Sequence, residues 1–188
     1  RILKEENAHI VMAGRVHQAD GPMQEKLTEI LTIIDNNSVL KERAHFIQNY
    51  DEPLARSLAR GADMALNTPT TRNGNGEMIS TEACGTSIFK DMLGNTILIS
   101  TDDGGVADAR IRAEREGVSD FTPPYLEITG ETYQEELDSL YAQMRQASRI
   151  INDGNRITHT IEQLKEYLPV ISGERMIQDY LEMTFPKE

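Results

Sequence analysis

Short apolar runs alternate with segments of helical periodicity through about the first 110 residues of this chain. This alternation is typical of βα units, whose strands form a parallel sheet because each connecting helix returns the chain to the same edge. The runs expected to be buried strands are 9–13, 44–47, 62–66 and 96–100. The predicted fold class is therefore α/β, a Rossmann-like parallel sheet with flanking helices.

Helical segments are expected between these strands. The segment that begins at Asp20-Gly21-Pro22 repeats its apolar residues every three or four positions, which predicts one buried helix face. Two further helices are expected over 52–60 and 85–93. The intervening segment 67–81 is rich in polar residues and contains Asn73-Gly-Asn-Gly76, and it is expected to be a loop.

Beyond the Asp102–Gly105 segment, strand patterns fade and helical patterns remain. Thr132-x-x-Glu135 is a capping-box pattern, Thr160-x-x-Gln163 is expected to start a second helix, and apolar residues within 176–181 indicate a third. We therefore divide a single domain, 1–188, into a parallel α/β part at 8–108 and a helical part at 130–188. Because Arg1–Glu6 resembles the end of a helix, the chain is expected to be a piece of a longer protein.

Charge and composition exclude several functions. With 19 Lys and Arg against 31 Asp and Glu, the formal net charge is −12, which argues against binding to nucleic acid. No apolar run approaches the ~20 residues needed to cross a membrane. One cysteine, Cys84, cannot form an internal disulfide, so a reducing, cytoplasmic location is expected. The four histidines have no metal-ligand spacing, and we predict no metal site.

A ligand is expected beyond the carboxyl ends of the strands. In an open parallel sheet this edge forms the binding crevice, and it would gather the segments 14–17, 49–51, 67–69 and 101–105 on one rim. Gly85-Thr86-Ser87 would open a helix at the same rim, where free amides and the helix dipole favour a phosphate. The alternative is that the two hydroxyls of this triplet only cap the helix.

Four blocks in order resemble the α-glucan (glycogen, starch or maltodextrin) phosphorylases, especially the shorter prokaryotic type. They are His9–Asp20, Phe46–Arg56, Ala62–Pro69 and Glu82–Lys90, and the likeness runs from about residue 8 to 108. The resemblance implies the C-terminal lobe of a two-lobed GT-B glycosyltransferase. It also implies phosphorolysis, in which inorganic phosphate releases glucose 1-phosphate from an α-1,4-glucan.

The same resemblance implies a cofactor and a set of site residues. Lys90 would be the catalytic lysine that holds pyridoxal 5′-phosphate, and Tyr50 would pack near that cofactor. Its phosphate would lie against Gly85, Thr86 and Ser87. The glucosyl hydroxyls would face Glu82, Ala83, Cys84 and Gly85. The partner would be an N-terminal lobe that this chain does not contain, so the chain alone is expected to be inactive; a homo-oligomer is left open.

Two alternatives remain. Retaining nucleotide-sugar glycosyltransferases, such as glycogen and starch synthases, often carry Glu-x7-Glu, whose second glutamate accepts hydrogen bonds from ribose. The residue eight positions after Glu82 is Lys90, and an ammonium group cannot accept a hydrogen bond, which favours the phosphorylase. Gly104–Asp108 nevertheless resembles bacterial glycogen synthases. The other alternative is a non-catalytic Rossmann-like module that binds sugar or phosphate, with Lys90 an ordinary surface lysine.

Overall fold

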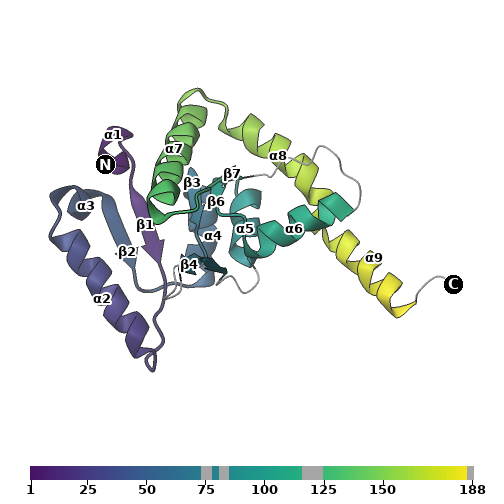
Figure 1. The fold of residues 1–188 in the computed structure, drawn as a ribbon, viewed down its shortest axis with the longest axis horizontal. Helices are drawn as coiled ribbons and strands as arrows, with labels where there is room; N and C mark the ends of the chain where they lie inside the picture. Colours follow the sequence, from purple (N-terminus) through teal and green to yellow (C-terminus); the bar gives the residue numbers. More distant parts are fainter. Residues whose placement is uncertain (73–77, 81–84, 116–124, 186–188) are drawn as a thin grey trace. The chain divides into compact units, whose positions relative to one another are not determined.

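The computed structural model describes residues 1–72, 78–80, 85–115 and 125–185 (Figure 1). The chain forms two compact units, Arg1–Leu58 and Ala59–Glu188, which we call unit 1 and unit 2. Each is described by itself below. The organisation of 1–188 as one domain stays a prediction.

Unit 1 contains a two-stranded parallel sheet. Its elements are α1 (Ile2–Glu5), β1 (Ile10–Ala13), α2 (Gly21–Asp35), α3 (Ser38–Arg43) and β2 (Ala44–Ile47). Strand β1 pairs with β2 in parallel, with Ile10 opposite Ala44. Helix α4 (Glu52–Gly61) follows and ends in unit 2.

The helices of unit 1 start at polar caps that the sequence supplies. The Asp20 carboxylate accepts a hydrogen bond from the backbone N–H of Met23 at 3.1 Å and starts α2. Asn37 Oδ1 accepts from the N–H groups of Val39 and Leu40, both at 3.1 Å, and starts α3. No helix was predicted over Ser38–Arg43, so α3 was missed.

Unit 2 holds a second sheet and most of the helices. Its elements are β3 (Met64–Asn67), β4 (Thr70–Arg72), β5 (Met78–Ser80), α5 (Thr86–Leu93), β6 (Ile97–Ser100), α6 (Gly104–Arg115), β7 (Leu126–Glu127), α7 (Tyr133–Asn152), α8 (Arg156–Ile171) and α9 (Gly173–Thr184). The strand order is β3-β6-β7, and both pairs are parallel. The predicted α/β class with parallel strands and a helical C-terminal part is therefore confirmed.

Strand β6 is the centre of the core of unit 2. All four of its residues are buried, and they alternate between the two faces of the sheet. Ile97 and Ile99 pack in a cluster with β7 and α7, whereas Leu98 packs on the opposite face in a cluster with residues from α5, α6 and α8. Coverage of both faces by helices explains why this strand reads as a continuous apolar run.

Two strand elements differ from the sequence prediction. The segment 67–81, expected to be a loop, contains the antiparallel pair β4–β5, with Thr71 opposite Ile79. An Asn-Gly sequence between two short strand-forming runs is a hairpin signal that we read only as a loop. Strand β7 was also missed, because two residues are too few to produce a periodic pattern.

The C-terminal helices begin at identifiable residues. The predicted capping box of α7 is confirmed: Thr132 Oγ1 accepts from the N–H of Glu135 at 3.3 Å, and Glu135 Oε2 accepts from the N–H of Thr132 at 2.9 Å. Helix α8 begins at Arg156, four residues before the predicted start at Thr160. Within the described ranges no helix combines the length and apolar character that a membrane crossing requires.

Candidate functional site

The carboxyl ends of the strands meet in pairs within each unit. In unit 1 the residue after β1, Gly14, donates its N–H to the carbonyl of Ile47 at the end of β2 at 3.2 Å. In unit 2 the N–H of Thr101 donates to the carbonyl of Asn67 at 3.2 Å, and Asn67 Nδ2 donates to Ser100 Oγ at 2.9 Å. In each unit, the carboxyl ends of two neighbouring strands therefore lie side by side. The expectation that all four share one rim stays a prediction.

Two helices of unit 2 start close together. Gly85 immediately precedes α5, is buried and has a φ of +67°, which favours glycine. A Cβ atom at this position would lie 3.2 Å from both the Cα and the N of Gly105 in the first turn of α6. Only a residue without a side chain allows this approach, which brings two positive helix ends together at a place suited to an anion.

Polar atoms without partners lie in the segment that joins β6 to α6. Asp103 Oδ1 accepts a hydrogen bond from the N–H of Gly104 at 2.7 Å. Its other oxygen, Oδ2, and Thr101 Oγ1 are buried without a hydrogen-bond partner in the described part of the chain. A buried polar atom costs about 1–3 kcal/mol when its hydrogen bond is missing, so this segment is suited to a polar ligand or to water.

Asp102 is committed to a structural network at the end of β6. It accepts hydrogen bonds from Arg110 Nη2 at 2.6 Å and from Tyr125 Oη at 2.7 Å. Burial by itself would raise the pKa of Asp102, but these hydrogen bonds outweigh it and hold that pKa below its usual value. Burial raises the pKa of Tyr125, and the bond to Asp102 adds to this effect. Asp102 and Asp103 therefore have separate hydrogen-bond partners within unit 2.

Lys90 lies on α5 four residues after Thr86, so the two residues share one face of the helix. Its side chain is exposed, whereas Ile88 and Met92 on the opposite side are buried in the core. Burial raises the pKa of the neighbouring Asp91 to about 6, and the charge of Lys90 partly offsets this rise. The lysine amine is thus accessible to a ligand one helical turn from the start of α5.

The structure brings together part of the predicted site. Gly85, Thr86, Ser87 and Lys90 belong to one helix and its first turn. The N-cap position is Gly85, so neither hydroxyl of the Thr86-Ser87 pair occupies the capping position. The residues predicted to face the sugar, Glu82, Ala83 and Cys84, lie outside the described residues.

Two sequence predictions concern residues away from α5. Tyr50 follows β2 in unit 1 and is 41% exposed, and its place beside the cofactor stays a prediction. The described residues contain no group of three or more His, Cys, Asp and Glu side chains arranged to hold a metal ion.

Comparison with known proteins finds glycogen phosphorylases. The chain is 33% identical over 95 residues to "Glycogen phosphorylase" of Mycobacterium tuberculosis (strain CDC 1551 / Oshkosh), which covers 50% of this chain and 10% of that protein. It is 23% identical over 191 residues to "Glycogen phosphorylase" of Aquifex aeolicus (strain VF5), which covers 97% of this chain and 26% of that protein. No family model matches the chain.

Among solved structures, AviGT4, a glycosyltransferase involved in Avilamycin A biosynthesis, aligns with 92% of this chain and 46% of its own chain, at a TM-score of 0.39 and 15% identity. The parallel pairing of the strands by itself gives the α/β class of the chain. The resemblance to glycogen phosphorylases that the four sequence blocks predicted is confirmed. The chain spans only 10% to 26% of the length of the curated relatives described above.

Proposed function

We propose that this chain is the cofactor-bearing part of a glycosyltransferase of the α-glucan phosphorylase type. The observation that carries the proposal is the geometry of α5: Gly85 packs the helix start against Gly105, and the exposed Lys90 follows one turn later. The similarity to glycogen phosphorylases over half of the chain supports the same function.

The residues at α5 fit pyridoxal 5′-phosphate, which presents an aldehyde and a phosphate group. The amine of Lys90 would hold the cofactor through its aldehyde group. The backbone N–H groups at the start of α5 would bind the phosphate, because the helix dipole favours negative charge there. Thr101 Oγ1 is a buried hydroxyl without a partner in the described residues and offers one further donor in the same unit.

The reaction would transfer a glucosyl group from an α-1,4-glucan to inorganic phosphate. The C1–O bond to the glucan breaks, a C1–O bond to phosphate forms, and the released 4-hydroxyl takes up a proton. The bound cofactor would supply a second phosphate group for acid–base chemistry beside the substrate. The chain's own contribution would be to hold that group at the α5 start and to bind the glucosyl hydroxyls through residues 82–85.

Lys90 also argues against transfer from a nucleotide sugar. A donor ribose needs a hydrogen-bond acceptor, and an ammonium group offers none. Both relatives are much longer than this chain. We expect catalysis to need regions that correspond to the rest of these relatives. We therefore expect the 188 residues alone to be inactive.

Cofactor attachment is tested on the full-length protein with added pyridoxal 5′-phosphate. We expect a near-ultraviolet absorbance band and, after borohydride reduction, a mass increase on the peptide that contains Lys90. Lys90→Ala should abolish both signals. The matched control is Lys165→Ala, which removes an exposed lysine on α8 and should leave both unchanged. A folded wild-type protein without the band or the modified peptide would contradict the cofactor assignment.

The reaction itself is tested by two parallel assays on the same protein. Glucose 1-phosphate should form from maltodextrin and inorganic phosphate, and Lys90→Ala should remove this activity. Transfer of glucose from UDP-glucose or ADP-glucose to maltodextrin should not be detected. Nucleotide-sugar transfer without phosphorolysis would instead establish the synthase alternative.

A further inference from the structure

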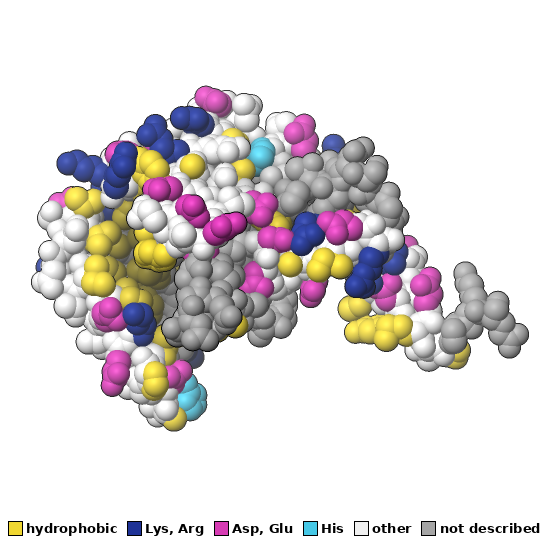
Figure 2. All heavy atoms as spheres, viewed as in Figure 1, with side chains coloured by type: hydrophobic (Ala, Val, Ile, Leu, Met, Phe, Trp, Pro, Cys, Tyr) yellow, Lys and Arg dark blue, Asp and Glu magenta, His cyan; other side chains and the backbone are white. Residues whose placement is uncertain are grey.

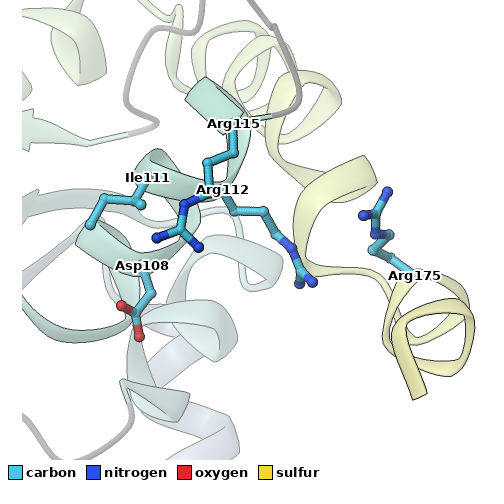
Figure 3. A pocket seen from close by; sticks show the side chains of 5 residues that line it. All are labelled: Asp108, Ile111, Arg112, Arg115 and Arg175. Atoms are coloured by element: carbon cyan, nitrogen blue, oxygen red, sulfur yellow. The ribbon is translucent and has the colours of Figure 1, made fainter. Parts of the chain in front are cut away.

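Residues of helices α6 and α9 of unit 2 line an open pocket of about 540 Å³, and Lys90 is not among them. The described residues that line it are Asp108, Ile111, Arg112, Arg115 and Arg175 (Figure 3). The volume falls within the range of roughly 300–1,000 Å³ that is usual for small-molecule sites. None of the lining residues belongs to the α5 site, so the pocket needs an explanation of its own.

The periodicity of α6 creates one side of this pocket. Asp108, Ile111, Arg112 and Arg115 are spaced three, four and seven residues apart, which places them on one helix face. The buried residues Val106, Ala109 and Ala113 lie on the other side of the helix, in the core. The face that carries the arginines is consequently free to meet α9.

Two of the arginines are held in place by one carboxylate. Asp179 on α9 forms ion pairs with Arg112 of α6 and with Arg175 of its own helix, the latter through Nε at 3.0 Å. Figure 3 shows Arg112 extending from α6 towards the helix that carries Arg175. Arg115 is exposed, and its side chain has no ion-pair partner in the described part of the chain. The pocket thus contains two fixed guanidinium groups and one that is available to a ligand.

The local charge is opposite to that of the whole chain. Three arginines meet two carboxylates here, Asp108 and Asp179, although the chain has a formal net charge of −12. Figure 2 shows that Asp and Glu side chains lie among the Lys and Arg side chains in this part of unit 2. Guanidinium groups bind phosphate oxygens through paired, charge-assisted hydrogen bonds, and several around one cavity are typical of phosphate recognition.

We propose that this pocket binds a small phosphomonoester, with the phosphate group held by Arg112, Arg115 and Arg175. Asp108 accepts a hydrogen bond from a hydroxyl group of the ligand, and Ile111 contacts its apolar face. Inorganic phosphate could bind only to the arginines, whereas a sugar phosphate could also contact Asp108 and Ile111. The ligand site is distinct from the cofactor and substrate site proposed at α5.

The test measures ligand binding to the full-length protein by isothermal titration calorimetry, with inorganic phosphate, glucose 1-phosphate and neutral glucose as three separate ligands. The protein carries Lys90→Ala, so that binding is independent of the proposed cofactor. We expect Arg115→Gln to weaken phosphate or sugar-phosphate binding at this site about tenfold or more, since it removes a hydrogen bond between charged groups. The number of phosphate sites per chain at the working concentration should fall by one.

Two control variants locate the site. Arg149→Gln removes an exposed arginine from α7 and should leave affinity within about twofold, because long-range charge effects are screened at physiological salt. Asp108→Asn removes a repulsive carboxylate and should strengthen the binding of inorganic phosphate. Binding of glucose 1-phosphate but not inorganic phosphate would show that the pocket also recognises the sugar. Equal binding by the Lys90→Ala protein with and without Arg115→Gln, or no binding of either phosphate, would overturn the proposal.

Discussion

Units 1 and 2 have the same kind of local sequence pattern and very different cores. In unit 2 every residue of β6 is buried, and helices cover both faces of the sheet. Among the residues described in unit 1, only Leu3 and Ala44 are buried hydrophobic residues. The difference shows that an alternation of apolar runs and amphipathic segments specifies strands and helices. The number of buried residues depends on how many helices and strands pack against each sheet.

The strands explain this difference. In unit 2, β6 has a strand on each edge, β3 and β7, so the centre of the sheet is shielded. In unit 1, β1 and β2 have only each other within the described residues, and Val11 in β1 is 46% exposed. A two-stranded sheet is marginally stable by itself, so we expect the backbone amides of β1 and β2 to exchange faster than those of β6.

The largest contrast should come from truncating matched strand residues. Ile99→Ala in β6 removes a fully buried side chain and should lower the free energy of unfolding by about 2–5 kcal/mol, because it leaves a cavity. Val11→Ala in β1 should cost less than about 1 kcal/mol, because the side chain is already half exposed. Urea unfolding, with hydrogen exchange to assign each transition, measures both. Similar losses in the two variants would contradict the contrast between the units.

Two glycines offer the next test. A Cβ atom at Gly94, after α5, would overlap the backbone carbonyl of Ala59, whereas one at Gly14 in unit 1 would meet nothing within 4 Å. Gly94→Ala should therefore destabilise unit 2 by about 3 kcal/mol, because backbone must move. Gly14→Ala should change stability by less than about 1 kcal/mol. A thermal unfolding series decides this, and a harmless Gly94→Ala would mean that α4 and α5 do not approach so closely.

Asp91 gives a prediction for the pH dependence of the free energy of unfolding. Here the ionised side chain lowers stability. Its pKa is raised by burial to about 6, so the folded state binds the proton more tightly than the unfolded state. The associated stability is present below about pH 4 and is lost as the pH rises through about 6. Asp91→Asn should therefore stabilise the protein by roughly 1–3 kcal/mol at pH 8 and have little effect at pH 4. The exposed Asp35→Asn in unit 1 should change little at either pH.

The smallest contrast concerns ion pairs. Arg110→Gln removes the partner of the partly buried Asp102 and should cost about 1–2 kcal/mol, whereas Arg56→Gln breaks the exposed pair with Glu52 in unit 1 and should cost about 0.5 kcal/mol or less. The Asp102 pKa is lowered in the folded state, so this stabilisation is present above about pH 4 and disappears as the pH falls further. Urea midpoints at pH 7 and pH 3 measure both effects. If Arg110→Gln lowered the free energy of unfolding equally at pH 7 and pH 3, the ion pair with Asp102 would not explain the loss.

Much of the fold could be predicted from the sequence, because the residues within one helix or strand indicate its conformation. The strand at 44–47 and the capping box of Thr132 and Glu135 were predicted at the residues where they occur. The start of α5 beside Gly85 and the position of Lys90 on it were also predictable, because spacing within one helix fixes which residues share a face. The resemblance to phosphorylases added the chemical roles, which stay a proposal.

Contacts between segments far apart in the sequence could not be predicted from it. Tyr125, which immediately precedes the two-residue strand β7, donates a hydrogen bond to Asp102, and nothing near either residue in the sequence indicates the other. The pocket between α6 and α9 is a similar case. Its arginines on α6 show a helical spacing that could have been noticed, but the position of Arg175 depends on how α9 returns to α6.

The sequence by itself determined the α/β class, the parallel strands and the helix that carries Lys90, because these follow from local periodicity and end signals. Tertiary structure alone decided that β6 is central, that Gly85 meets Gly105, and that Arg112 and Arg175 share Asp179. The physical reason is that local patterns reflect the conformation of one segment, whereas burial and charge pairing depend on which segments pack together.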